Sequence, residues 1–194
     1  MGSLGGGGRG IFAIDITDPT KLSGGSKDKW KPLLWEFTSE DDPHLGFSHA
    51  RPSLVMMNNG RWAVLVGNGN EDIATDGQGG KAQLFALFIE GPGADGKWDL
   101  GRDYVRLSTN TGSVGDRNGA FSPTAVDLDG NGTVDRVYVG DLYSNLWAFH
   151  VASDNRARWT LAYGKPLFSA NSGKSKTKFP ITVRPLVTQP TEDV

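Results

Sequence analysis

A short run of oxygen-bearing residues carries the clearest chemistry in this chain. Residues 127–135 read Asp-Leu-Asp-Gly-Asn-Gly-Thr-Val-Asp, so oxygen-bearing side chains stand at loop positions 1, 3, 5 and 9. Ca²⁺ takes about six to eight oxygen ligands at roughly 2.3–2.6 Å, and a tightly wound loop can supply them from alternate residues. We therefore predict a calcium site with these ligands: Asp127, Asp129, Asn131, Thr133 (through its backbone carbonyl) and Asp135.

This loop differs from an EF-hand. An EF-hand loop runs about twelve residues and closes with a bidentate Glu before a helix. The corresponding position here is Tyr138, and the alternating run 136–140 is typical of a strand, so Asp135 would have to close the site. Gly130 and Gly132 permit the positive φ angles that tight winding needs. The alternative is a plain turn between two strands, because Asp, Asn and Gly are ordinary turn residues.

Other candidate sites give weaker signals. A second acidic loop contains Asn68, Asn70, Glu71, Asp72 and Asp76. It could hold another cation, but its irregular spacing favours a solvated hairpin loop. The three histidines, His44, His49 and His150, lack a third ligand at metal-site spacing and are expected to be surface or hydrogen-bonding residues. No Ser/His/Asp or paired-carboxylate arrangement can be argued from spacing, so we expect no enzymatic activity.

Composition excludes several functional classes. The 194 residues carry a net charge of −2 with mixed signs, which favours neither nucleic acid nor anionic lipid as a partner. The absence of cysteine removes disulfides, thiol catalysis and thiolate metal sites. No apolar run approaches the ~20 residues of a membrane helix. The first residues lack the pattern of a signal peptide. The 27 glycines favour strands and turns over long helices.

Short strands must position these loops. Alternating β-branched and aromatic runs, bounded by Gly, Asn, Asp and Pro, predict an all-β fold. The Asn58-Asn59-Gly60 sequence fits a hairpin turn between two of the strands. The predicted strands are 10–15, 33–37, 52–57, 62–66, 82–89, 104–107, 124–126, 136–139, 145–149, 159–163 and 181–187.

An internal repeat specifies the architecture further. The segment that starts at Gly46-Phe-Ser leads through two strands to Val64-Leu-Val-Gly-Asn68. About seventy residues later the same order recurs from Gly119-Ala-Phe-Ser to Val137-Tyr-Val-Gly-Asp141. Residues 179–185 resemble the start of a third copy. Four-stranded units in tandem are typical of a β-propeller, whose blades need neighbours to bury their faces.

The repeat count predicts a partial propeller. We expect residues 1–194 to form a single propeller segment with two whole antiparallel blades and two partial ones. Propellers have about four to eight blades, and a shorter stack would expose edge strands. The chain is therefore expected to be part of a larger propeller. Residues 1–9 are expected to be flexible or vector-derived.

The chain resembles the PilC/PilY family, the tip-associated adhesins and biogenesis factors of bacterial type IV pili. The resemblance is strongest in the run from Val126 to Phe149, which contains the acidic loop, the strand Arg-Val-Tyr-Val-Gly and the sequence Asn-Leu-Trp-Ala-Phe. Supporting segments occur in family order at residues 7–19, 34–37, 59–69 and 164–168. The resemblance therefore spans nearly the whole chain.

The resemblance implies a fold and a function. Family members carry a C-terminal propeller-like domain with one calcium loop, which maps onto residues 127–135. It implies support of pilus assembly, calcium-dependent control of pilus extension and retraction, twitching motility, surface attachment and virulence. The implied partners are pilins, minor pilins and host or abiotic surfaces. The implied location is outside the cytoplasm, at the pilus tip, the cell surface, or the periplasm and outer membrane.

Two other functional classes remain open at this point. Integrin-α-like or FG-GAP propellers also place Asp-x-Asp-x-Asn loops between strands, but they repeat the loop in several blades, and one unit here has it clearly. A quinoprotein-type propeller enzyme would be expected to contain a vicinal cysteine pair or a central acidic cofactor site, and this chain has no cysteine.

Overall fold

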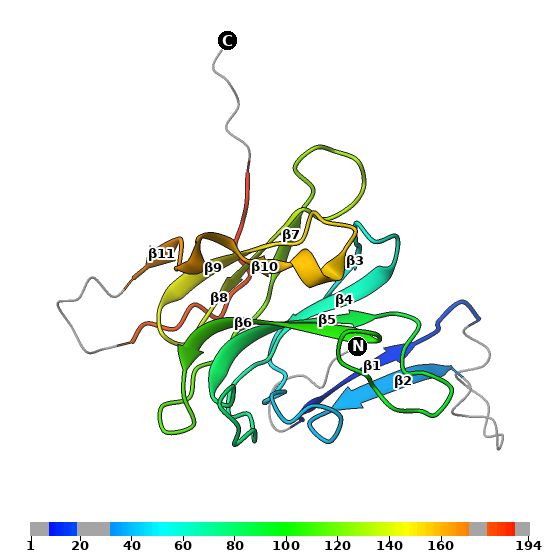
Figure 1. Ribbon diagram of the computed structural model, residues 1–194, viewed down its shortest axis with the longest axis horizontal. Helices are drawn as coiled ribbons and strands as arrows, with labels where there is room; N and C mark the ends of the chain where they lie inside the picture. The colour runs from blue at the N-terminus through cyan, green and yellow to red at the C-terminus, as the bar shows by residue number, and fades with distance from the viewer. Residues whose placement is uncertain (1–7, 19–31, 171–177, 189–194) are drawn as a thin grey trace, which may run out of the picture.

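The protein is an all-β assembly of antiparallel strands, as the sequence predicted. The computed structural model describes residues 8–18, 32–170 and 178–188. Figure 1 shows the strands in three groups that follow one another along the chain. The strands are β1 (Gly10–Ile14), β2 (Leu33–Thr38), β3 (Ser53–Met56), β4 (Trp62–Gly67), β5 (Lys81–Phe88), β6 (Tyr104–Gly112), β7 (Thr124–Val126), β8 (Arg136–Gly140), β9 (Asn145–His150), β10 (Thr160–Leu161) and β11 (Phe168–Ser169).

The groups correspond to the predicted repeat. Strands β1 and β2 form a hairpin-like pair, and β3-β4-β5-β6 form a four-stranded sheet in chain order, here called the first blade. The second blade has the order β10-β9-β8-β7, and β11 also pairs with β9. Two short 3-10 helices, η2 (Arg156–Arg158) and η3 (Ala162–Gly164), flank β10. None of the helices in the described ranges has the length and hydropathy that a bilayer crossing requires.

Three strand predictions need correction. The strand expected over 104–107 continues as β6 to Gly112. The strand expected over 159–163 is reduced to β10, because η3 begins at Ala162 and Tyr163 adopts a positive φ of 64° that breaks the ladder. The strand expected over 181–187 is absent: the segment is irregular, with isolated hydrogen bonds such as Ile181 N to Asp141 O at 2.9 Å. Pro185 has no N–H to donate, so a continuous ladder cannot form through it. The segment 1–9 was expected to be flexible or vector-derived, and its residues 1–7 lie outside the described residues.

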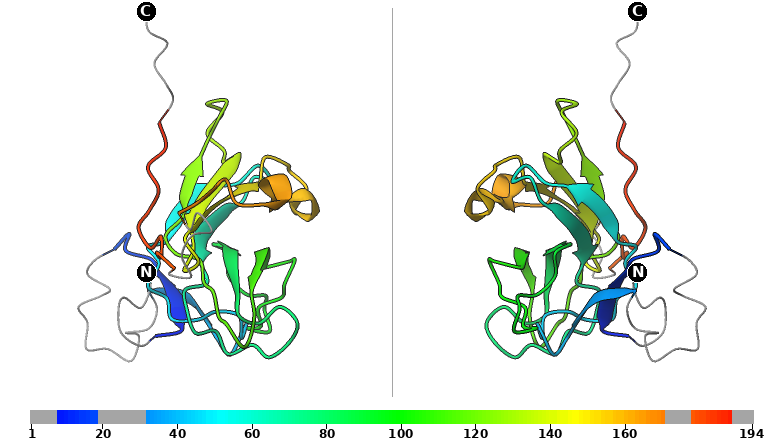
Figure 2. Two further views of the ribbon diagram at one scale, coloured as in Figure 1. Left: turned by 90° about the vertical axis from the view of Figure 1, so that its left-hand side faces the viewer. Right: turned by 90° about the vertical axis from the view of Figure 1, so that its right-hand side faces the viewer.

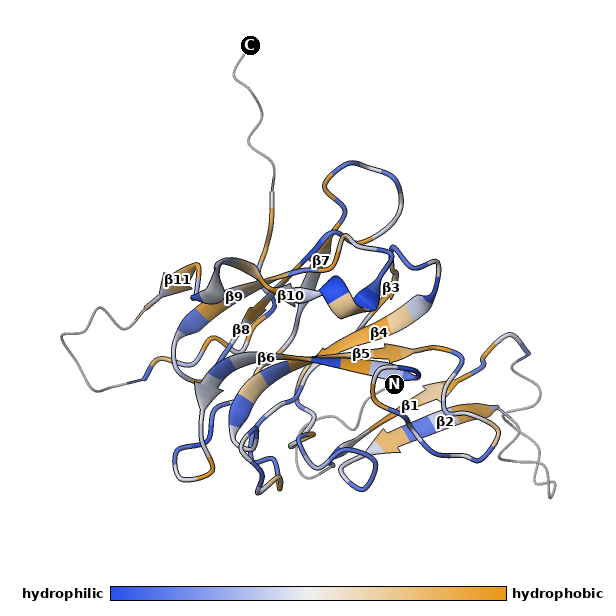
Figure 3. Cartoon of the chain, viewed as in Figure 1, coloured by the Kyte–Doolittle hydropathy of each residue, from blue (hydrophilic) through white to orange (hydrophobic). Residues whose placement is uncertain are grey.

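The first blade lies between two hydrophobic cores because its strands alternate. Leu84, Ala86 and Phe88 of β5 face the second blade, whereas Phe85 and Leu87 face the β1–β2 pair. Figure 3 shows the apolar residues concentrated along the strands and the polar residues in the connections. Figure 2 shows the groups edge-on, with β1 and β2 on one side of the first blade.

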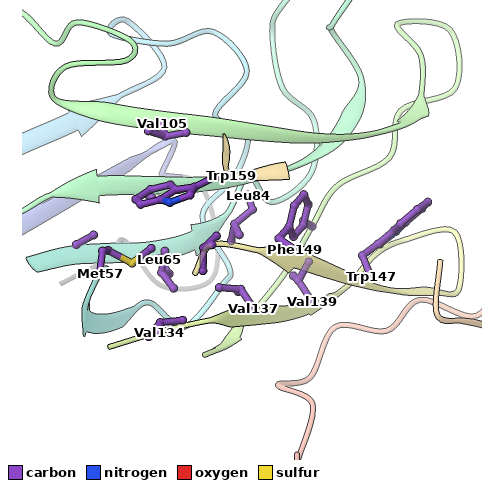
Figure 4. Close-up of a cluster of buried hydrophobic side chains, with 14 of the residues drawn as sticks. Met57, Leu65, Leu84, Val105, Val134, Val137, Val139, Trp147, Phe149 and Trp159 are labelled. Carbon is purple, nitrogen blue, oxygen red and sulfur yellow. The ribbon is translucent and has the colours of Figure 1, made fainter. Parts of the chain in front are cut away.

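The interface between the blades is the larger core. Side chains from the two sheets point toward one another in Figure 4. Met57 and Phe149 are fully buried, and Trp159 from the second blade is 5% exposed against Phe88 of the first. Burial of apolar area at roughly 25 cal/mol per Å² holds the two blades together. The labelled members are Met57, Leu65, Leu84, Val105, Val134, Val137, Val139, Trp147, Phe149 and Trp159.

Each repeat also meets the next chain segment at an equivalent glycine. A Cβ on Gly67 would lie 2.3 Å from the carbonyl oxygen of Ala120, and a Cβ on Gly140 would lie 2.3 Å from that of Ile181. Any larger residue would push the two backbones apart. The repeat predicted from the sequence is therefore a repeat of close backbone packing.

Candidate metal centre

The acidic loop connects β7 to β8 and its ends are fixed by their ladder. Val126 pairs with Arg136, and Asp135 N donates to Val126 O at 2.9 Å. In Figure 1 the loop projects beyond the sheets, above the β7 label. Its two ends are thus held together while its middle faces solvent, which is the arrangement that lets a short loop wind around an ion.

The structure brings the three predicted carboxylates together. One oxygen from each of Asp127, Asp129 and Asp135 lies within 4.8 Å of the other two. Two oxygens that share a Ca²⁺ at roughly 2.3–2.6 Å can be at most about 5 Å apart. The spacing therefore fits a common cation. Within the described ranges this is the only group of three or more His or acidic residues with such spacing.

Asp127 organises the winding of the loop. Its Oδ1 accepts from Gly130 N at 2.8 Å, and its Oδ2 accepts from Gly132 N at 2.7 Å. Gly130 and Gly132 have φ angles of 76° and 88°, as the winding argument required. These backbone donors, Gly132 first among them, lower the pKa of Asp127 below its usual value. The carboxylate is therefore kept ionised, the form that binds a cation.

The middle of the loop forms a compact turn. Asp129 Oδ1 accepts from Asn131 N at 3.1 Å, and Asn131 Oδ1 accepts from Thr133 N at 2.8 Å. The Thr133 hydroxyl oxygen also lies 2.5 Å from Asn131 Oδ1. Asn131 is exposed and Thr133 is partly buried. Both predicted ligands therefore lie in the same turn as the carboxylates.

Asp135 closes the loop from its buried side. The residue is 8% exposed, and its Oδ2 accepts from Leu128 N at 2.7 Å. Its backbone carbonyl accepts from Val151 N at 2.9 Å, which fixes Asp135 to the end of β9. The most buried of the three carboxylates is thus the one that the sequence assigned to closure.

In the described part of the protein, no basic side chain forms an ion pair with the carboxylates of this loop. The salt bridges found there involve other acids, and none includes Asp127, Asp129 or Asp135. Like charges a few ångströms apart repel each other and disfavour ionisation unless a counter-charge is supplied. A divalent cation is the counter-charge that this donor set of hard oxygens prefers.

The second acidic loop has a different structure. Asp72 is buried, forms an ion pair with Arg117, and accepts from Gly80 N at 2.8 Å. Burial raises the pKa of Asp72 above its usual value despite this pairing. Asp76 bonds the Nε2 of His44 at 3.0 Å. Asp72 and Asp76 thus have protein partners, and the acids of this loop, unlike those of the first loop, do not converge.

The expectation that residues 68–76 form a solvated hairpin loop is therefore wrong for part of the loop. Asn68 is fully buried: its Oδ1 accepts from Gln83 N at 3.0 Å and from Ala120 N at 2.9 Å. Asp141 occupies the same place in the second blade and is also fully buried, with Trp147 Nε1 donating to its Oδ2 at 2.8 Å. These residues satisfy backbone groups at the blade ends.

Sequence reasoning missed a buried polar cluster around His44. Asp42 Oδ1 lies 2.7 Å from His44 Nδ1, and Asp42 Oδ2 accepts from Tyr104 OH at 2.9 Å. Arg106 Nη1 donates to the same carboxylate at 2.7 Å. Burial raises the pKa of the Tyr104 hydroxyl. The residues lie up to 64 positions apart, so no local spacing could have revealed the cluster.

The acidic calcium-type loop occurs in only one of the two blades that the structure describes. The equivalent β3–β4 connection in the first blade is a tight turn, with Gly60 N donating to Met57 O at 2.9 Å. An FG-GAP propeller would be expected to repeat the loop. The distribution seen here favours the pilus family instead.

Comparisons with known proteins agree with this fold. The family model of the PilY1 β-propeller domain matches residues 1–179. The type IV pilus biogenesis factor PilY1 of Pseudomonas aeruginosa strain PAO1 is 35% identical over 77% of the chain, and a PilY1 homolog of Xylella fastidiosa strain Temecula1 is 35% identical over 96%. The crystal structure of the P. aeruginosa PilY1 C-terminal domain covers 93% of the chain with a TM-score of 0.70 and 30% identity.

The matched relatives are much longer than this chain. The chain spans 11% of the P. aeruginosa protein and 12% of the X. fastidiosa homolog. It also spans 35% of the solved C-terminal domain. The likeness therefore concerns one part of those proteins.

Proposed function

The chain belongs to the PilY1 β-propeller family, and we propose that it is a non-catalytic, calcium-binding module of a type IV pilus biogenesis factor. The observation that supports calcium binding is the convergence of Asp127, Asp129 and Asp135 within 4.8 Å. With three carboxylates, a dissociation constant on the order of 10⁻⁶ to 10⁻⁴ M is expected, between sensor and extracellular designs.

The calcium ligands would be the loop residues already described. Carboxylates of Asp127, Asp129 and Asp135 would supply charge, while Asn131 and the Thr133 carbonyl would complete the oxygen set. The ion would neutralise the loop and hold its turns in one conformation. The closing residue is anchored to β9 through Val151, so ordering of the loop would be felt by the second blade.

The biological role follows from differential binding. A ligand shifts a conformational equilibrium only if it binds the two states unequally. In this proposal the filled and empty loops differ in their affinity for pilus components such as pilins and minor pilins. Calcium would thereby control pilus extension and retraction, and with them twitching motility and attachment to host or abiotic surfaces. Such a module acts outside the cytoplasm, at the pilus tip, the cell surface or the periplasm.

Substitutions in the full-length gene test this role. Asp127→Ala or Asp135→Ala mimics the empty loop, whereas Asp127→Lys or Asp135→Lys places a positive charge among the remaining carboxylates. Surface piliation or twitching should change in opposite directions for the two kinds of variant. Asp154→Ala and Asp154→Lys, at an exposed acid outside the loop, are the matched controls. If all variants are produced normally and retain wild-type piliation, motility and attachment, calcium control is excluded.

A further inference from the structure

The candidate calcium loop is bonded to the neighbouring blade through one side chain. Asn58 belongs to the β3–β4 turn of the first blade. Its Nδ2 donates to Val134 O at 2.8 Å, and its Oδ1 lies 3.0 Å from the Thr133 hydroxyl oxygen, whose one proton is shared between Asn58 Oδ1 and Asn131 Oδ1. A third hydrogen bond runs alongside, from Val134 N to Met56 O at 3.0 Å. The loop and the turn are thus bonded directly across the blade interface.

These contacts fall on the part of the loop that carries the proposed ligands. Thr133 is the residue whose carbonyl would bind calcium, and its hydroxyl also meets Asn131 Oδ1 at 2.5 Å. Asp135 follows two residues after Thr133. Asn58 therefore contacts the backbone between the expected ligands Thr133 and Asp135. In the sequence, Asn58 and Thr133 are 75 residues apart.

The turn that carries Asn58 is rigid and anchored in the core. Met57 N donates to Arg61 O at 2.9 Å, and Gly60 N donates to Met57 O at 2.9 Å. Met57 forms a parallel β-bridge with Val134 and is fully buried. Val134 is 7% exposed in the same inter-blade core. A change in the order of the loop therefore reaches packed side chains of both blades.

We propose that Asn58 is a positioning residue that couples calcium occupancy of loop 127–135 to the β3–β4 turn of the first blade. This inference rests on the proposed calcium site. When the ion binds the Thr133 carbonyl, Thr133 and Val134 lose mobility. The contacts of the Asn58 side chain with Val134 O and with the Thr133 hydroxyl then transmit that loss to the turn. The coupling makes the first blade, which has no acidic loop of this kind among its described residues, responsive to calcium.

Hydrogen exchange on the full chain, with calcium and with chelator, tests the coupling. At a hundredfold excess over Kd, calcium should slow exchange through loop opening by up to about 100-fold. Gly130 and Gly132 amides report the loop, and Met57 and Gly60 amides report the turn. In the wild type both regions should become protected. In Asn58→Ala the loop should still be protected, and the turn should respond clearly less than in the wild type, because the backbone bond from Val134 N to Met56 O remains.

A matched pair of variants at Thr133 separates coupling from simple destabilisation. Thr133→Val removes the hydroxyl but keeps the backbone carbonyl that would bind calcium, whereas Thr133→Ser keeps both. Thr133→Val should weaken the response of the turn, and Thr133→Ser should preserve it. Asn58→Ala should also weaken calcium binding about fivefold, the value of roughly one neutral hydrogen bond.

The outcomes distinguish this inference from the proposed function. If calcium fails to protect even the loop of the wild type, the proposed function and the coupling both fail. If the loop is protected in every variant and the turn of Asn58→Ala or Thr133→Val responds as in the wild type, the coupling alone is overturned. A calcium response of the turn that is clearly reduced in Asn58→Ala and kept in Thr133→Ser supports it.

Discussion

The two acidic loops of this chain balance their charge in opposite ways. In loop 127–135 the carboxylates lie close to one another and accept hydrogen bonds mainly from backbone amides of their own loop. In the loop around residues 68–80, Asp72 pairs with Arg117 and Asp76 bonds His44. The loop of Asp72 therefore has its counter-charges within the protein, whereas the carboxylates of loop 127–135 converge on a common point. Both loops are rich in acidic residues, so acid content alone does not distinguish a candidate metal site from a structural loop. What distinguishes them is whether basic side chains of the protein lie next to the carboxylates.

The largest expected effect concerns the loop with its own counter-charge. Asp72→Ala leaves Arg117 without its partner and Gly80 N without its acceptor. The expected loss of unfolding free energy is about 3 kcal/mol, at the low end for a broken buried pair, because 21% of the Arg117 side chain remains exposed. Urea unfolding with calcium and with chelator measures it, and the loss should be the same in both. A loss that disappears in calcium would contradict the division between the loops.

The next effect belongs to the calcium loop. At a hundredfold excess over Kd, calcium should stabilise the folded form by about 2.7 kcal/mol, equivalent to a rise in Tm of roughly 5–10 °C for a chain of this size. Mg²⁺ should substitute poorly, because it prefers a tighter octahedral site. Thermal melts of the wild type and Asp135→Asn provide the check, since the variant keeps an acceptor for Leu128 N but loses the charge. Identical melts in calcium and chelator would indicate a plain turn.

The calcium response should also depend on pH in one direction. Hydrogen bonds from backbone amides, Gly132 foremost, lower the pKa of Asp127 in the folded state. The stability that this carboxylate contributes is therefore fully present above its unfolded pKa, near about 3.9, and is lost as pH falls through the lower folded value. The rise in Tm with calcium should persist at pH 5 and disappear only in more acidic solution. A midpoint near pH 6 to 7 would instead indicate a histidine ligand.

The smallest effect is expected at the exposed acid of the other loop. Asp76 has a side chain that is 58% exposed, although its partner His44 is buried. Asp76→Asn should cost less than about 1 kcal/mol, as for other exposed pairs, and should leave the calcium-dependent rise in Tm unchanged. Thermal melts in calcium and chelator measure both quantities. A reduced calcium response in this variant would show that the two loops are not independent.

Local sequence patterns predicted most of the strands and the candidate ligands. Alternation and turn residues placed β3, β4, β7 and β8 to within a residue or two, and the regular spacing of the loop identified the three carboxylates that converge. These features depend on neighbouring residues. The strand expected over 181–187 is irregular in the structure: Pro185 has no N–H to donate, and Ile181 N donates to Asp141 O of the second blade.

Long-range partners could not be predicted in the same way. Arg117 lies 45 residues from Asp72, and Asn58 lies 75 residues from Thr133. The pairing of β5 with β6, Lys81 with Gly112, brings Arg117 to Asp72, whereas the contact between the two blades brings Asn58 to Thr133. The sequence therefore predicted a solvated loop around Asp72, whereas in the structure Asp72 forms an ion pair with Arg117.

Calorimetric titration with Ca²⁺ tests the central claim most directly. The wild type should bind one ion per chain with a Kd on the order of 10⁻⁶ to 10⁻⁴ M. Neither Asp135→Asn nor Asp135→Ala should give a measurable heat of Ca²⁺ binding. Asp76→Asn, which removes a charge from the other acidic loop, should titrate like the wild type. Equal heats from the wild type and Asp135→Asn would contradict the assignment of calcium to residues 127–135.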